Sequence, residues 1–202
     1  MLNKLYPLVL ILFVVTLLVT VVVGGEGTKV SLRSESATLT PDEVLQMIKA
    51  KGFHCPGEKI KGKFIPQYEA KTISGAQVVI DQATGLMWQQ SENPKGVTWK
   101  NAEAYVAEMN TQKLAGFADW RIPTVEELIS LVTAKQKNEV YLDPVFKKVS
   151  LLSTWTCDIV KDAFAGAFFL NFGDGKPSQG NRAFGMGHVR LVRSMNKTAT
   201  AK

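Results

Sequence analysis

The chain has 202 residues, 24 Lys and Arg against 18 Asp and Glu, and a formal net charge of +6. This length accommodates one domain of ordinary size together with a leader and a linker. The basic residues are scattered, with small clusters at 59–63 and 147–148, whereas a nucleic-acid surface needs a concentrated basic face. We therefore expect a solvated surface and no nucleic-acid partner, with at most a weak attraction to anionic glycans or lipid headgroups.

Residues 5–23 form an almost unbroken apolar run, long enough to cross a bilayer as a helix. Lys4 and the amino terminus favour a cytoplasmic N-terminus. A cleaved signal peptide is the alternative, because Val23-Gly24-Gly25 is a passable cleavage site, but its apolar core is usually shorter. We expect residues 1–25 to be a signal anchor that holds the domain at the membrane, outside the cytoplasm, in the periplasm or on the cell surface; secretion after cleavage is the alternative.

Residues 26–39 contain few large apolar side chains and are rich in Gly, Ser and Thr, which is typical of a flexible linker. Thr40 and Glu43 then form a capping box, with a proline at the first helical position. Gly52 is a suitable C-terminal stop. The sequence therefore predicts a short helix within an extension that covers residues 40–75.

Two cysteines, Cys55 and Cys157, are present. In a chain exported from the cytosol they suggest one disulfide, although free thiols or pairing between chains fit the sequence too. His54 adjoins Cys55, but no second pair lies at metal-ligand spacing, and the other histidine is His188. We expect no metal and no cofactor.

The next segments predict a β-hairpin followed by a helix. Residues 77–81 and 86–89 are β-prone and are separated by a turn that ends in a glycine. We expect Trp88 to lie in the core. Thr98 caps a predicted helix that ends near Asn110, with an apolar face facing the domain.

A second capping box, Thr124 with Glu127, follows a proline and begins a predicted helix over 125–134. Its apolar residues fall at helical spacing and predict one buried stripe. Trp120 and Arg121 precede this helix. We expect both to have structural roles, as an aromatic anchor and as a guanidinium that binds carbonyls or a carboxylate.

The C-terminal part predicts two strands and the loop between them. Residues 166–172 are apolar on both faces, as in a covered strand, and residues 173–181 are expected to form a turn-rich loop. Residues 188–193 predict the closing strand, whose arginines pair with carboxylates inside the domain. Residues 196–202 form a polar tail that is expected to fray.

Four ordered motifs carry a family resemblance: Asp81-x-x-Thr-Gly-Leu-Met-Trp88, Thr98-Trp-x-x-Ala-x-x-Tyr105, Asp119-Trp-Arg-Ile-Pro-Thr-x-Glu-Glu-Leu128 and Val189-Arg-Leu-Val-Arg193. With them the chain resembles the bacterial family named after the C-terminal domain of the Legionella collagen-like adhesin. The resemblance implies an α+β, C-type-lectin-like domain over 76–195, with short antiparallel sheets and two main helices. It implies no activity by itself.

Together with the predicted anchor and linker, the resemblance suggests a non-enzymatic, membrane-anchored module that binds a glycan or another envelope protein. The candidate ligand-binding residues lie on loops that mix an aromatic ring, amides and charges: Trp155, Asp158, Asn171, Asp174 and Arg182. A structural or assembly component of the envelope is one alternative.

An enzyme related to the formylglycine-generating group is another alternative. Those enzymes use two cysteines near the end of the domain, but Cys55 lies outside the region of resemblance. Calcium binding by Asn171, Asp174 and Asn181 is a further reading, although the EF-hand spacing is absent. Where relatives carry small hydroxyl residues this chain has Cys157 and Asp158, so the resemblance does not transfer a site to this strand.

Overall fold

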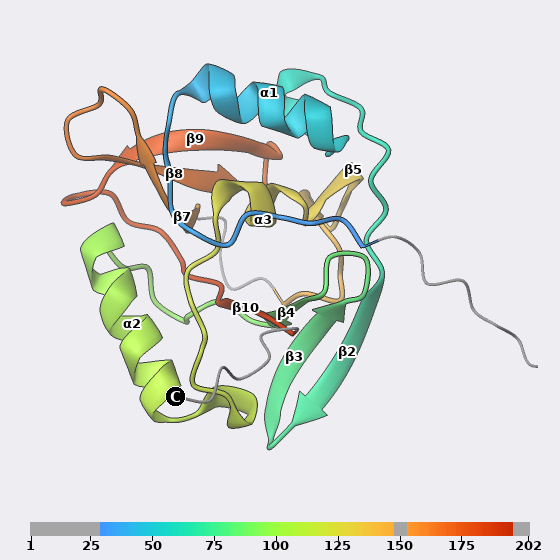
Figure 1. The fold of residues 1–202 in the computed structure, drawn as a ribbon, viewed down its shortest axis with the longest axis vertical. Helices are drawn as coiled ribbons and strands as arrows, with labels where there is room; N and C mark the ends of the chain where they lie inside the picture. Colours follow the sequence, from blue (N-terminus) through green and yellow to red (C-terminus); the bar gives the residue numbers. More distant parts are fainter. Residues whose placement is uncertain (1–28, 148–152, 196–202) are drawn as a thin grey trace, which may run out of the picture.

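Two four-stranded sheets carry most of the fold in the computed structural model, which describes residues 29–147 and 153–195 (Figure 1). The first sheet has the order β1-β7-β8-β9, the second has the order β10-β4-β3-β2, and β5 pairs with β6 alone. The strands are β1 (Thr38–Leu39), β2 (Tyr68–Ile73), β3 (Ala76–Asp81), β4 (Leu86–Gln89), β5 (Val132–Lys137), β6 (Val140–Leu142), β7 (Thr154–Val160), β8 (Gly166–Asn171), β9 (Lys176–Asn181) and β10 (Val192–Ser194).

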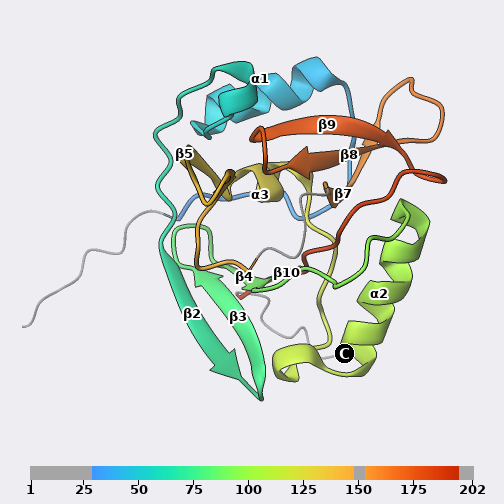
Figure 2. The ribbon, with the colours of Figure 1, turned by 180° about the vertical axis from the view of Figure 1, so that it is seen from behind.

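The helices complete a mixed α+β fold, as the sequence predicted. They are α1 (Pro41–Lys51), α2 (Trp99–Thr111) and α3 (Val125–Ile129), with the 3-10 turns η1 (Pro56–Glu58) and η2 (Leu114–Gly116). The short helix α3 lies between α1 and strands β7 and β8, whereas α2 lies beside the second sheet (Figures 1 and 2). No helix among the described residues could cross a bilayer, and the predicted span at 5–23 lies outside them.

Several local predictions are confirmed. The capping box of Thr40 and Glu43 begins α1, and Gly52 ends it in the left-handed conformation at φ 69°. Strands β3 and β4 form the predicted hairpin, and Trp88 is fully buried. The side chain of Thr98 accepts a hydrogen bond from the backbone of Asn101 at the start of α2.

The helix predicted over 125–134 is shorter than expected. Its capping box is present, but α3 ends at Ile129 and the chain continues from Val132 as β5. The Ser130 hydroxyl donates to the Glu127 carbonyl at 2.6 Å, which competes with continued helical hydrogen bonding. The predicted apolar stripe is nevertheless buried: Val125, Leu128, Ile129 and Val132.

The predicted linker at 26–39 is wrong for its described part. Residues 29–39, which we call the strap, lie against the domain as extended chain (Figure 1). The Val30 amide donates to the Ala83 carbonyl at 2.8 Å, and β1 pairs in parallel with β7. Low apolar content predicted disorder, but the strap is held by backbone hydrogen bonds to a sheet edge and by polar contacts.

Two expectations near the C-terminus also need correction. Residues 176–181, expected within a loop, form strand β9 paired with β8, because their backbone completes the ladder although their composition is turn-like. The closing strand is shorter than 188–193, since β10 begins at Val192 and His188 makes only an isolated bridge with Thr154.

The core has two parts. The first lies among α1, α3 and the inner face of the first sheet and includes Ile48, Leu128 and Phe168. The second includes Trp120 and Trp155. Together they fix both ends of β7, the strand that carries two of the five candidate ligand residues, Trp155 and Asp158.

Candidate functional site: a buried clamp and an exposed loop face

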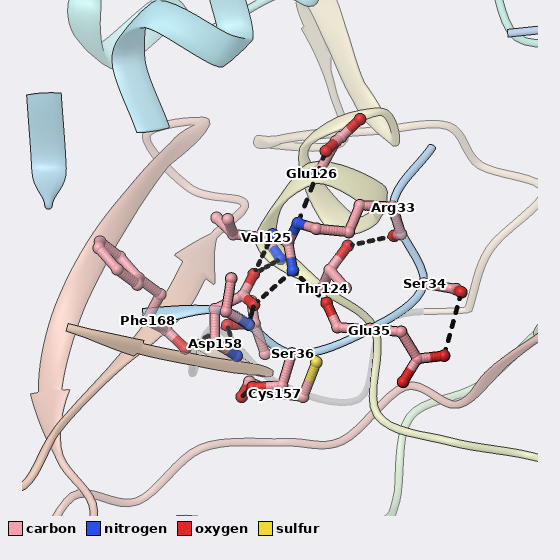
Figure 3. A network of polar contacts seen from close by, with 12 residues as sticks. Arg33, Ser34, Glu35, Ser36, Thr124, Val125, Glu126, Cys157, Asp158 and Phe168 are labelled. Carbon is pink, nitrogen blue, oxygen red and sulfur yellow. Dashed lines mark hydrogen bonds and ion pairs between the residues drawn. The ribbon is translucent and has the colours of Figure 1, made fainter. Parts of the chain in front are cut away.

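Asp158 lies at the centre of a buried polar cluster, which we call the clamp (Figure 3). Its two carboxylate oxygens accept hydrogen bonds from both terminal nitrogens of Arg33 at 2.8 Å. They also accept from the Ala37 amide at 2.8 Å and the Val125 amide at 2.7 Å. Asp158 therefore has its acceptors occupied by the strap and by the first turn of α3.

The electrostatics of the clamp favour the charged pair. The hydrogen bond that Arg33 donates to Asp158 raises the pKa of the Arg33 guanidinium, although burial opposes the shift. Glu126 adds a second carboxylate 3.9 Å from Arg33, and Lys51 balances it at 3.1 Å. Bidentate Arg–carboxylate pairs are among the strongest side-chain interactions, so the clamp attaches the strap to the domain.

A second bidentate pair supports the start of α3. Arg121 donates to both oxygens of Glu127, at 2.6 and 2.5 Å. The same carboxylate accepts from the Thr124 amide at 3.0 Å, which completes the capping box. The structural role predicted for Arg121 is thus confirmed. Trp120 has one too, since its buried indole donates to the Leu114 carbonyl at 2.8 Å.

Trp155, predicted as a ligand-binding residue, is only 1% exposed. Its indole packs edge-on against Phe169, with ring centroids 5.8 Å apart, and donates to the Val97 carbonyl at 3.0 Å. A Cβ added at Gly187 would lie 2.9 Å from the indole nitrogen, so the chain passes directly over the ring. Trp155 is therefore a core residue, and its buried indole has no free face on which a ligand could stack.

The remaining predicted residues do not converge. The Asn171 side chain accepts from the Gly173 amide at 2.8 Å, and that of Asp174 accepts from the Lys176 amide at 3.2 Å, so both stabilise the turn between β8 and β9. Arg182 follows the other end of β9. A six-residue strand separates them by about 17 Å, which is too far for one small ligand.

The calcium hypothesis fails for the same reason, because the side chains that would bind the ion lie far apart. Asn181, at the far end of β9 from Asp174, accepts from the Ala183 amide at 2.8 Å. Within residues 29–147 and 153–195, no group of three or more His, Cys, Asp or Glu is arranged to hold a metal ion.

The expected disulfide is also wrong, because Cys55 and Cys157 are both free in the structure. Cys55 belongs to the first core cluster and Cys157 packs against the second, so different parts of the core surround them. Burial raises the pKa of the Cys55 thiol to about 11 and that of Cys157 to about 12. Neither thiol forms a nucleophilic thiolate near neutral pH.

Sequence reasoning missed an exposed aromatic surface, which we call the loop face. It consists of the loop after β7 and the loop after β9, which the Arg182 amide joins by a hydrogen bond to the Ala165 carbonyl at 2.8 Å. Three large apolar side chains are exposed there: Phe164 at 98%, Phe184 at 84% and Met186 at 53%. The Arg182 guanidinium lies over the Trp99 ring, 5.3 Å from its centroid.

Trp155 explains why the second of these loops keeps its shape. Cβ atoms added at Gly180 or Gly185 would lie 3.0 and 3.1 Å from the Trp155 ring. The loop after β9 therefore packs directly against the indole. The buried ring therefore supports the loop that presents Phe184. A sequence signal for this was present in the glycines that alternate with large residues in Phe184-Gly-Met-Gly187.

Residues 77–193 match the family described as Lcl C-terminal domain, which covers more than half of the chain. The chain belongs to this family, as the four motifs predicted. No curated protein matches the chain. The strap and α1 lie N-terminal to the matched region, and so the clamp joins a family residue, Asp158, to Arg33 outside it.

Proposed function

We propose that this protein is a non-enzymatic binding module, anchored outside the cytoplasm through residues 5–23, that presents the loop face to a glycan or to another envelope protein. The family resemblance supports a C-type-lectin-like arrangement for the domain and an extracytoplasmic location. The observation that carries the proposal is the exposure of Phe164 and Phe184 on adjoining loops.

Isolated exposed apolar residues need no explanation, but three on two joined loops do. Aromatic residues, Met and Arg are enriched at protein interfaces relative to the rest of the surface. They also suit sugars, whose C–H faces stack on rings while Arg182 and Asn181 bind hydroxyl or carboxylate groups. Rigid support from Trp155 favours binding, because an ordered loop loses less entropy on association.

The loop face also lies on the far side of the domain from Lys29, where the described chain begins (Figures 1 and 2). An anchor that precedes Lys29 would leave the loop face directed away from the membrane. This position suits a module that reaches for a partner in the surrounding envelope.

A glycan array probed with the full-length protein tests the sugar arm of the proposal. Binding that is lost in Phe184→Ser and retained in Glu108→Gln, an exposed residue on α2, supports a glycan ligand. The protein arm is tested by replacing Phe184 with a photo-reactive amino acid in growing cells. A cross-link to an envelope protein after illumination supports a protein ligand. Failure of both arms would favour the assembly alternative.

Catalysis by the cysteines has little physical support. Both thiols have raised pKa values, and Cys55 lies in a different part of the core from Cys157. The redox chemistry of the formylglycine-generating group needs two cysteines within reach of each other. We therefore retain the enzyme reading only as a minor alternative to binding.

A further inference from the structure

The segment between η1 and β2 presents a second surface that the proposed function does not use. Along residues 61–67 the odd-numbered residues are exposed and the even-numbered ones are partly covered. The exposed residues are Lys61, Lys63, Ile65 and Gln67. This alternation is that of extended chain with one face toward solvent, so two ammonium groups and an aliphatic side chain project in the same direction.

Ile65 is an unusual residue to leave exposed. It is 76% exposed, one of the large hydrophobic side chains in the described chain that remain uncovered. Beside it is a hollow of about 370 Å³ whose lining includes Val30, Lys63 and Ile65 and contains no acidic residue. We call Lys61, Lys63 and Ile65 the lysine face.

The charges of the lysine face are not neutralised within the domain. None of the ion pairs between described residues involves Lys61 or Lys63. Nearby Lys51 differs, since it binds Glu126 at 3.1 Å and the Ser31 carbonyl at 2.6 Å. A surface with unpaired cations and an exposed aliphatic residue suits a partner that is anionic and apolar at once.

The position of the lysine face in the chain indicates which partner this is. Residues 61–67 cross the strap beside its first residues (Figures 1 and 2), and Val30 and Lys63 line the same hollow. Five residues separate Val23, the end of the predicted span, from Lys29. They reach at most about 20 Å when fully extended, whereas a domain of this size is roughly 40 Å across.

We propose that the lysine face rests on the anionic headgroups of the membrane that holds residues 5–23, with Ile65 inserted at the interface. The inference depends on the proposed anchor. Juxtamembrane lysines are attracted to anionic lipid within about a Debye length of the surface. An aliphatic side chain at the headgroup boundary adds apolar burial. Together these contacts orient the domain and keep the loop face outward.

Hydrogen exchange on the full-length protein in lipid nanodiscs tests the inference. One set of discs contains phosphatidylcholine alone and the other contains about 30% phosphatidylglycerol, which supplies the anionic surface. We expect amides in 61–67 to exchange about three- to tenfold more slowly in the anionic discs, and the difference to vanish in about 0.5 M salt. The double variant Lys61→Gln/Lys63→Gln loses the difference.

The matched control is Lys95→Gln/Lys100→Gln, two exposed lysines near the start of α2, which keeps the difference. Intact mass measured on the same discs separates the two proposals. Full-length chain with equal exchange in both discs overturns the lysine face and leaves the anchor standing. A chain that lacks its first 25 residues and is absent from the discs overturns both.

Discussion

Arg33 and Asp158, 125 positions apart in the sequence, meet in a bidentate ion pair with both N–O distances at 2.8 Å. Arg33 belongs to the strap and Asp158 to β7, within the matched family region. The pair therefore makes the N-terminal extension part of the domain. If the anchor precedes the strap, the Arg33–Asp158 pair also determines where on the domain the anchor is attached.

Replacing Asp158 by Asn tests the clamp. The variant keeps the shape of the side chain but removes its charge and puts an amide donor where the Ala37 and Val125 amides donate. We expect a loss of about 2 kcal/mol in the free energy of unfolding, below the range for fully buried pairs because Arg33 is partly exposed. Urea denaturation measures it.

A double-mutant cycle with Arg33→Met supplies the control for this prediction. The two substitutions should be strongly non-additive, because each removes the same interaction. Amide exchange at Ile159, whose N–H donates to the Ala37 carbonyl at 2.9 Å, should quicken in both variants. Additive effects would mean that the pair contributes no coupling and that the strap is held by its backbone alone.

The two capping boxes provide a matched comparison. Thr40→Ala removes an exposed cap and should cost about 0.5–1 kcal/mol, whereas Thr124→Ala should cost about 2 kcal/mol. The Thr124 hydroxyl is buried, accepts from the Glu127 amide at 3.1 Å and donates to the Arg33 carbonyl at 3.0 Å. Thermal unfolding of both variants measures the difference, and equal costs would argue against α3 as an element that joins strap and core.

The free thiols predict a loss of stability in alkali. Burial raises the pKa of Cys157 from 9.0 to about 12, so the folded state holds the proton more tightly than the unfolded state. The stabilising effect is complete below pH 9 and is lost as the pH rises toward 12, by about 1 kcal/mol at pH 10.

In the Cys157→Ala variant, the free energy of unfolding should fall less steeply with rising pH than in the unmodified chain. Urea midpoints measured from pH 8 to pH 10.5 test this. Alkylation of Cys157 by iodoacetamide at pH 8 should be slow until denaturant is added. Rapid reaction of the folded protein at pH 8 would show that Cys157 is a reactive thiolate, and the enzyme alternative would regain support.

Gly187→Ala tests the packing of the second loop on Trp155. The added Cβ would lie 2.7 Å from the Ser153 carbonyl oxygen and 2.9 Å from the indole nitrogen. We expect a loss of about 1–3 kcal/mol from overpacking and a shift in tryptophan emission. A Trp155→Ala variant should lose about 3–5 kcal/mol; a stable Trp155→Ala protein would restore the view that this ring serves a ligand.

Sequence patterns predicted the local elements well because their causes are local. Capping boxes at Thr40 and Thr124, a turn at Gly85 and the periodicity around Leu128 each depend on neighbours within a few residues. Family motifs then placed these elements in one domain. The α3 boundary was missed because the helical spacing of the apolar residues from Val125 to Val132 concealed the start of the hairpin of β5 and β6, which turns at Asn138 and Glu139.

The site was predicted poorly because exposure is not a local property. Trp155 lies between two threonines and Phe184 between an alanine and a glycine, yet the first ring is buried and the second exposed. Only the path of residues 180–187 over the indole decides this. The strap was missed for a similar reason. Its ordering depends on an acceptor 125 positions away, which composition cannot reveal.

Binding of the full-length protein to isolated cell envelopes, compared between the unmodified chain and Phe164→Ser/Phe184→Ser, tests the central claim most directly. Both side chains are exposed, so the variant should keep its stability within about 0.5 kcal/mol. Its affinity should fall at least about tenfold, while Glu108→Gln, which changes an exposed residue on α2, retains full affinity. Equal binding by all three proteins would contradict the loop face as the binding surface.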